Sequence, residues 1–278
     1  MHYFPNYPKE KIMILEKNKL DELYEAVIEC GEYAKKMQHE VHRSFKADGS
    51  VLTEADTAIS RKLIKCIRTL FPEAAVISEE DIVENNRESE WIFILDPIDG
   101  TDVYSQGMPA FAVSIGILDK SHTPVGAMIA APRFGVGCDS LLLRMDPYED
   151  AYINGEKLII EGNKDNALQV TMGSKGPREL DFSSFRGKIR VLGSTIIHIL
   201  APLVFPSIDG VVVQKCFAWD IASSHAVMKH YGMDLVNKDG KLFEYSDSFI
   251  FDKTPLTEIL YGGTEKGREK LRLTLPPL

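Results

Sequence analysis

Cysteine is scarce in this sequence, and long apolar runs are missing. The four cysteines, Cys30, Cys66, Cys138 and Cys216, show none of the paired spacings of a zinc site or a disulfide framework. We therefore expect free thiols in a reducing compartment. No apolar run approaches the roughly 18 residues that a membrane-spanning helix needs, and the N-terminus lacks the pattern of a signal peptide. These absences predict a soluble, cytoplasmic protein with no membrane partner.

Basic residues are also in deficit. The chain has 32 lysines and arginines against 41 aspartates and glutamates, which gives a formal net charge of −9. This balance argues against a nucleic-acid polymer as partner. It does not exclude a phosphate ester, because bound metal ions can invert the local field. The seven histidines form no metal-ligand spacing, and we interpret His198 and His225 as packing or surface residues.

Hydrophobic residues make up 44% of the 278 residues, which is ample for a large core. Apolar periodicity predicts amphipathic helices from Asn18 and after Thr53. The apolar segments 111–118 and 124–130 read as adjacent strands, and their small residues indicate close packing of helices on the sheet. Asn154-Gly155 predicts a hairpin turn. After a polar stretch at 161–167, strands and helices alternate. We therefore divide the chain into an N-terminal arm (1–17), an N-terminal α+β half (18–160) and a C-terminal α/β half (161–278).

The stretch from Trp91 to Thr101 combines a predicted strand with a closely spaced group of chemically reactive residues. Its first half is a run of large apolar residues typical of a buried strand, and its second half reads Asp-Pro-Ile-Asp-Gly-Thr. Asp96 and Asp99, with the carbonyl of Ile98 between them, can direct oxygen ligands at one point, as Mg²⁺ requires. A short helix starting at Thr101 would direct free N–H groups at the same point and favour a phosphate. The alternative is an acidic turn in solvent.

The hexamer resembles the signature of the inositol monophosphatase family of Mg²⁺-dependent, lithium-sensitive phosphatases. Trp219-Asp220-x-Ala222 is similar to the second signature of that family. The resemblance implies an α/β fold (an α+β sandwich) with layers in the order αβαβα, a large antiparallel sheet and a second, smaller mixed sheet. It spans roughly residues 20–265.

The resemblance also assigns roles to residues of this sequence. It implies two or three Mg²⁺ ions, held by Glu79, Asp96, the carbonyl of Ile98, Asp99 and Asp220. Asp56 and Thr101 would orient the attacking water, with Glu79 as a third catalytic residue. The substrate-binding candidates are the residues of two turns, Gly100, Thr101, Gly193, Ser194 and Thr195.

Several of these residues also have a purely structural interpretation. Thr53 and Asp56 match a helix capping box, and Asp220 in a first helical turn favours the helix dipole. Ser194 can cap a helix. The three acids from Glu79 to Asp81 can be a solvated loop. Both interpretations can hold for the same residue.

The predicted function is hydrolysis of a small phosphorylated polyol or sugar by in-line attack of water, without a phosphoenzyme. Inositol phosphate is the first candidate, with fructose 1,6-bisphosphate, 3′(2′),5′-bisphosphate nucleotides and histidinol phosphate as alternatives. Inositol-specific relatives carry a glutamate where this chain has Val213, and bisphosphate nucleotidases often carry a lysine where it has Asp102. A non-catalytic, metal-binding regulatory protein is the alternative of a different class. Relatives also suggest a homodimer, by analogy alone.

Overall fold

The fold is built on two sheets, seen in a computed structural model that describes residues 15–40, 42–46, 49–135 and 137–278. The larger sheet has seven strands in the order β3-β4-β5-β6-β7-β8-β9. Only β3 and β4 pair in parallel within it, and the remaining pairs are antiparallel. Its strands are β3 (Ala75–Ser78), β4 (Trp91–Asp99), β5 (Ala112–Asp119), β6 (Pro124–Ala131), β7 (Leu141–Met145), β8 (Tyr152–Ile153) and β9 (Glu156–Lys157).

The second sheet has five strands in the order β11-β10-β12-β14-β13 and is mixed. The strands β11, β10 and β12 run in parallel, whereas β14 is antiparallel to both of its neighbours. Its strands are β10 (Gln169–Met172), β11 (Lys188–Arg190), β12 (Gly210–Val213), β13 (Asp234–Val236) and β14 (Leu260–Gly263). A separate two-stranded ribbon pairs β1 (Ser44–Phe45) with β2 (Val51–Leu52).

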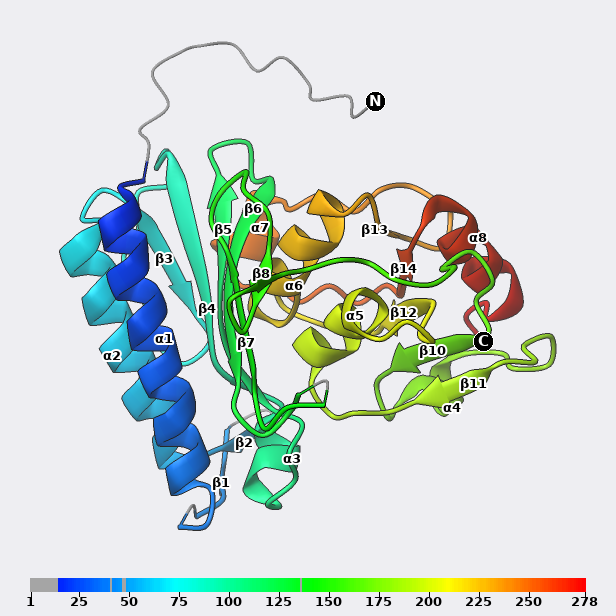
Figure 1. The fold of residues 1–278 in the computed structure, drawn as a ribbon, viewed down its shortest axis with the longest axis horizontal. Coiled ribbons are helices and arrows are strands. Elements are labelled where there is room, and N and C mark those ends of the chain that lie inside the picture. The colour runs from blue at the N-terminus through cyan, green and yellow to red at the C-terminus, as the bar shows by residue number, and fades with distance from the viewer. Residues whose placement is uncertain (1–14, 41, 47–48, 136) are drawn as a thin grey trace.

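Helices cover both sheets in layers (Figure 1). The long helices α1 (Lys17–Met37) and α2 (Glu54–Leu70) cover the outer face of the larger sheet, and α5 (Thr195–Val204) and α6 (Ala218–His230) lie between the two sheets. Beyond the second sheet lies α8 (Glu265–Thr274). The shorter helices are α3 (Thr101–Ser105), α4 (Gly176–Glu179) and α7 (Asp247–Ile250). The predicted αβαβα arrangement of a large and a smaller mixed sheet is confirmed.

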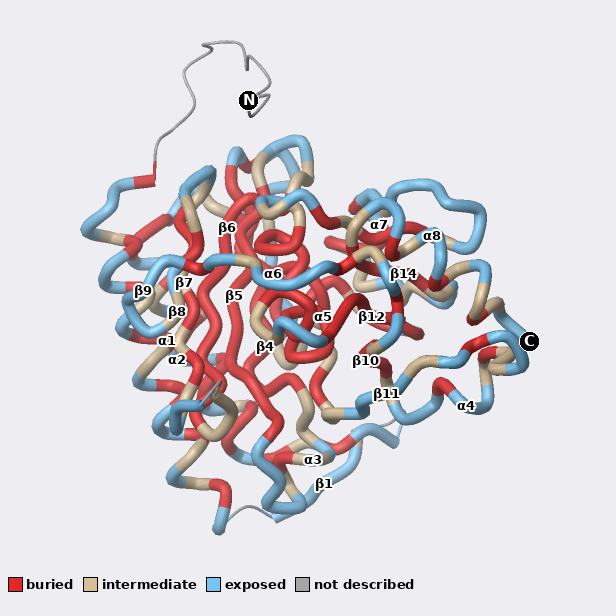
Figure 2. The backbone as a smooth tube through the Cα atoms, turned by 45° about the vertical axis from the view of Figure 1, so that its right-hand side comes forward, coloured by how far each residue is buried: buried red, intermediate tan, exposed pale blue. Residues whose placement is uncertain are grey.

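Glycines let the helices approach the larger sheet closely. A Cβ added to Gly116 of β5 would lie 2.7 Å from the backbone of Ala222 in α6, and one added to Gly31 of α1 would lie 2.8 Å from the Cβ of Ala130 in β6. The strands between these helices are buried along nearly their whole length (Figure 2). The predicted close packing of helices on small strand residues is therefore confirmed.

The hairpin predicted at Asn154-Gly155 is present. It joins β8 to β9, and both turn residues have positive φ, at 52° and 83°. The predicted arm over residues 1–17 lies almost entirely outside the described residues. The larger sheet ends at Lys157 and the second begins at Gln169, and the division of the chain at residues 160 and 161 stays a prediction. None of the helices in the described ranges is long and apolar enough to span a membrane.

Candidate active site

A bulge in β4 places two aspartates on one face of the strand. Asp96 pairs with Ser114 and Asp99 pairs with Ala112, so three steps along β4 match two steps along β5. In a regular strand, residues three apart point to opposite faces, and one extra residue restores them to the same face. Pro97 lies inside the bulge, where its missing N–H costs no ladder bond. We expected the strand to end before Asp96; it continues to Asp99 because β5 still pairs with it.

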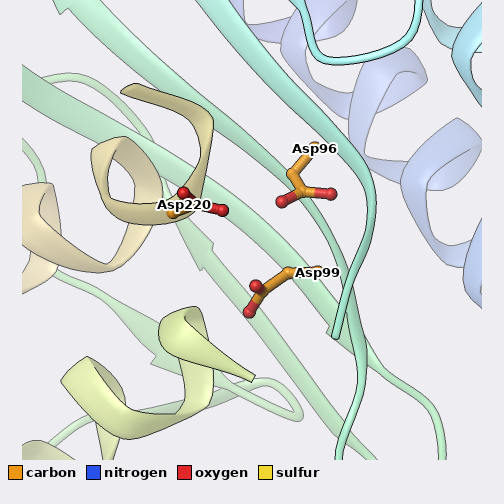
Figure 3. Close-up of side chains that lie close together, drawn as sticks. All are labelled: Asp96, Asp99 and Asp220. Atoms are coloured by element: carbon orange, nitrogen blue, oxygen red, sulfur yellow. The ribbon is translucent and has the colours of Figure 1, made fainter. Parts of the chain in front are cut away.

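Asp220 completes a cluster with these two aspartates. Oxygens of Asp96, Asp99 and Asp220 all lie within 4.8 Å of one another, and the three side chains point toward a common centre from β4 and the first turn of α6 (Figure 3). Burial raises the pKa of Asp96 and Asp220 well above the ordinary range, with neighbouring carboxylates adding to the shift. Three buried carboxylates this close are costly without a cation among them.

The donor set fits a divalent cation. Asp96 is 1% exposed, and among the described residues its Oδ1 has no hydrogen-bond partner although it is buried. A buried, unpartnered carboxylate oxygen needs a ligand, and hard oxygen donors suit Mg²⁺. The cluster is thus a site that could hold metal, as the sequence predicted for all three aspartates.

Asp99 is also tied to the second half of the chain. Its Oδ2 accepts hydrogen bonds from the hydroxyl of Ser194 and from the backbone N–H of Ile196 at 2.8 Å. Burial raises the pKa of Asp99 to about 6, and these donors lower it in part. Ser194 caps α5 by accepting from the N–H of Ile197 at 3.1 Å. Capping is therefore confirmed for Ser194, and contact with substrate stays a prediction.

The turn before α5 has a further support in His198. The buried ring accepts a hydrogen bond at Nε2 from the N–H of Leu192 at 2.8 Å, and burial lowers the pKa of His198 to about 4. His198 is thus a neutral packing residue, as predicted. A Cβ added to Gly100 would lie 3.2 Å from the carbonyl oxygen of Gly193, so the two turns predicted to bind substrate are in contact.

Asp56 and Thr101 meet as predicted. The Thr101 hydroxyl lies 3.1 Å from Oδ1 of Asp56 and 2.9 Å from the carbonyl oxygen of Ile98. The other oxygen of Asp56 accepts from the N–H of Thr53 at 2.9 Å and from the Thr53 hydroxyl, which confirms the capping box. Burial raises the pKa of Asp56 to about 6. Structural and catalytic interpretations are therefore compatible for this residue.

Asp220 likewise combines two roles. One of its oxygens accepts from the backbone N–H of Phe217 at 2.6 Å, at the start of α6. This bond fixes the carboxylate in the first helical turn, where the helix dipole favours a negative charge. The same residue faces Asp96 and Asp99.

Glu79 follows the end of β3 and is neutralised by a lysine that the sequence did not identify. The Nζ of Lys46 lies 2.6 Å from carboxylate oxygens of both Glu79 and Glu80. Burial raises the pKa of Glu79, and Lys46 opposes this shift. Glu79 lies outside the group of three aspartates, although its charge raises the pKa of Asp96. Its role as a metal ligand stays a prediction.

A second cation fixes the segment that carries Glu79. Lys253 donates from Nζ to the carbonyl oxygens of Ser78 at 2.5 Å and Asp81 at 2.9 Å, and it lies 5.5 Å from the ring centre of Trp219. No local pattern could have identified Lys46 or Lys253, because their partners lie far away along the chain.

Comparison with known proteins agrees with this geometry. The profile of the inositol monophosphatase family matches residues 17–266. A fructose-1,6-bisphosphatase/inositol-1-monophosphatase of Thermotoga maritima is 28% identical over 72% of this chain and 77% of its own length. A Nus factor SuhB of Pasteurella multocida is 27% identical over 69% and 74%. A staphylococcal inositol monophosphatase, solved as a LiCl-soaked inhibitory complex, has the same fold, with a TM-score of 0.75 at 15% identity over 93% of this chain and 95% of its own.

The profile spans nearly the whole described chain and includes the bulged strand, the aspartate cluster and the Asp56–Thr101 pair. The chain belongs to the inositol monophosphatase family, whose members are phosphatases acting on phosphate monoesters.

Proposed function

We propose that this protein hydrolyses a small phosphomonoester with Mg²⁺ by direct attack of water. The observation that carries the proposal is the convergence of Asp96, Asp99 and Asp220 beside the hydrogen-bonded pair of Asp56 and Thr101. Carboxylates alone would repel an anionic ester. A site that gathers them in a chain of a phosphatase family is suited to metal and phosphate together.

The carboxylates would hold two or three Mg²⁺ ions, with Glu79 and the carbonyl of Ile98 as further ligands. Bound metal would supply charge neutralisation for the ester and a lower pKa for the attacking water. We expect lithium to inhibit the reaction, and the staphylococcal relative solved with LiCl supports this.

Thr101 would orient the water. Its hydroxyl lies within hydrogen-bond distance of both Asp56 and the Ile98 carbonyl; when it donates to Asp56, its oxygen can accept a hydrogen bond from a water molecule. The pKa of Asp56 is raised to about 6 by burial, so near neutral pH its carboxylate is ionised and can draw a proton through Thr101. The N–H groups of Gly100 and Thr101 would bind phosphate oxygens.

A phosphate-release assay tests the proposal. The substrates are inositol 1-phosphate, fructose 1,6-bisphosphate, histidinol phosphate and adenosine 3′,5′-bisphosphate, each with Mg²⁺ and with or without Li⁺. We expect Mg²⁺-dependent, Li⁺-inhibited release, its loss in Asp96→Asn, and its retention in Asp239→Asn, which removes an exposed carboxylate. Release that is undiminished in Asp96→Asn would refute the assignment.

A regulatory role without turnover is the second candidate, favoured by the relative named as a Nus factor. Calorimetry separates the two functions. Folded protein that binds Mg²⁺ and releases phosphate from none of the four esters supports the regulatory role. The homodimer and the cytoplasmic location stay predictions, and sedimentation of the purified protein tests the first.

A further inference from the structure

Ser114 of β5 carries a buried hydroxyl that has no hydrogen-bond partner among the described residues. The residue is only 1% exposed, which keeps solvent away from the hydroxyl. A buried polar group without a partner destabilises the folded state, and folded proteins keep few of them. An alanine would avoid this cost, so we expect the hydroxyl to gain a partner in another state of the protein.

Ser114 lies directly opposite Asp96 of the aspartate cluster. The two residues are Cα partners in the antiparallel pairing of β5 with β4, and the register shifts only beyond Asp96, toward Asp99. Directly opposed residues place their side chains on the same face of a sheet, with Cβ atoms about 4.5–5.5 Å apart. The Oδ1 of Asp96 is likewise buried and without a partner among the described residues. A hydroxyl donor and a carboxylate acceptor, both unpartnered, therefore lie side by side.

Both side chains lie on the face of the larger sheet that α6 covers. Successive side chains of a strand alternate between the two faces. Ala112 and Leu118, an even number of steps from Ser114 along β5, belong to the core between the two sheets. Asp96 points from β4 toward Asp220 in the first turn of α6 (Figure 3). Ser114 is therefore on the same side of the sheet as the proposed metal site.

The surroundings of Ser114 leave Asp96 as its natural partner. Of the four residues that border Ser114 on this face, all within the described strands, only Asp96 is polar. The others are Ala112 and Gly116 along β5 and the cross-strand partner Ile129 in β6. The backbone of α6 closes over this part of the sheet, since a Cβ added to Gly116 would lie 2.7 Å from it.

We infer that Ser114 is a positioning residue for Asp96: when the cluster holds metal, the Ser114 hydroxyl donates a hydrogen bond to the Asp96 carboxylate and fixes it as a ligand. This inference rests on the proposed function and adds a residue to its metal site. With Cβ atoms at this separation, rotation about the side-chain bonds alone can bring hydroxyl and carboxylate together. Carboxylates that ligate metals are themselves hydrogen-bonded, and loss of such a bond typically lowers metal affinity by about 10–100-fold.

Mg²⁺ affinity and metal-free stability together test the inference. In Ser114→Ala, calorimetry should show Mg²⁺ affinity lowered about tenfold. The urea midpoint in EDTA should stay unchanged or rise, because an unpartnered hydroxyl has been removed. The control is Ser89→Ala, which removes a buried hydroxyl that donates to the carbonyl of Asn86 at 2.8 Å, just before the start of β4. It should show the opposite pattern, with a lower urea midpoint and unchanged Mg²⁺ affinity.

Ser114→Cys separates hydrogen bonding from packing. A thiol fills the position of the hydroxyl but is a weak donor, so we expect Mg²⁺ affinity to fall as it does in Ser114→Ala. Wild-type affinity in Ser114→Ala would overturn the inference. Wild-type affinity in Ser114→Cys alone would also overturn it, by assigning the effect to packing.

The wild-type measurements distinguish this inference from the proposed function. Wild-type protein that binds Mg²⁺ but hydrolyses no ester would refute the proposed function alone, and the affinities of the Ser114 variants would still decide the role of Ser114. Wild-type protein that binds no Mg²⁺ would overturn both.

Discussion

Replacing Asp96 with asparagine should stabilise the metal-free protein while removing its response to metal. Asp96 is buried, its Oδ1 has no partner among the described residues, and one of its oxygens lies within 4.8 Å of an oxygen of Asp99 and of an oxygen of Asp220. Two unit charges at such a distance repel by roughly 3 kcal/mol at an effective dielectric constant of about 20. Protonation already relieves part of this cost, because burial raises the pKa of Asp96. We expect the free energy of unfolding near neutral pH to rise by about 2–4 kcal/mol.

The raised pKa values also predict the direction in which the free energy of unfolding changes with pH. A carboxylate whose pKa is raised in the folded state contributes stability below its ordinary pKa, and this stability is lost as the pH rises through the folded value. The pKa of Asp99 rises from 3.8 to about 6, so metal-free wild-type protein should lose about 3 kcal/mol from this group between roughly pH 4 and pH 6. Mg²⁺ should restore that stability in wild type.

Urea unfolding with EDTA or with Mg²⁺ measures both effects across this pH range. Asp239→Asn, an exposed substitution, is the control and should match wild type at every pH. The gain from Asp96→Asn should be large near neutral pH and vanish near pH 4. An Asp96→Asn protein that is less stable than metal-free wild type near neutral pH, or a gain that is the same at both ends of the range, would refute the electrostatic reasoning.

Three further substitutions test other parts of the argument. Asp56→Asn should lower turnover by about 10²-fold or more through loss of the general base, while calorimetry shows Mg²⁺ affinity retained; equal loss of both would contradict water positioning. Lys164→Met should lower the free energy of unfolding in urea by about 2–4 kcal/mol, because Nζ donates to the carbonyls of Phe205, Pro206 and Ile208; a neutral outcome would mean that water replaces the ammonium. Gly116→Ala should cost about 1–3 kcal/mol by thermal unfolding, since its Cβ would meet the backbone of α6 at 2.7 Å; unchanged stability would show that α6 can shift.

Residues in the two signature motifs could be placed from the sequence. Asp96 and Asp99 are close together along the chain, and Asp220 is marked by its own motif, so their shared chemistry was predictable before their positions were known. The capping box predicted at Thr53 and Asp56 is confirmed because such boxes depend only on residues three apart. Local rules sufficed wherever the interaction was local.

The contacts that organise the site are long-range and carried no such signal. Lys46 carries no local signal that marks its partners, yet it neutralises Glu79 and Glu80, more than thirty residues away along the chain. Lys253, which is far away along the chain, donates hydrogen bonds to the carbonyl oxygens of Ser78 and Asp81, on either side of Glu79 and Glu80. The segment around Pro97 reads locally as a turn, because Asp and Pro favour turns, whereas pairing with β5 extends the strand to Asp99.

These long-range contacts explain how the chain tolerates a cluster of buried negative charge. The N-terminus of α5 donates to Asp99, and the first turn of α6 holds Asp220, so two helices between the sheets face the carboxylates with their positive ends. Lys164 binds the carbonyls that follow α5 and so fixes the other end of that helix. Helix ends offset only part of the repulsion, because no donor among the described residues reaches the buried Oδ1 of Asp96. The uncompensated charge therefore lies at the centre of the cluster, on the residue where metal binding should return the most stability.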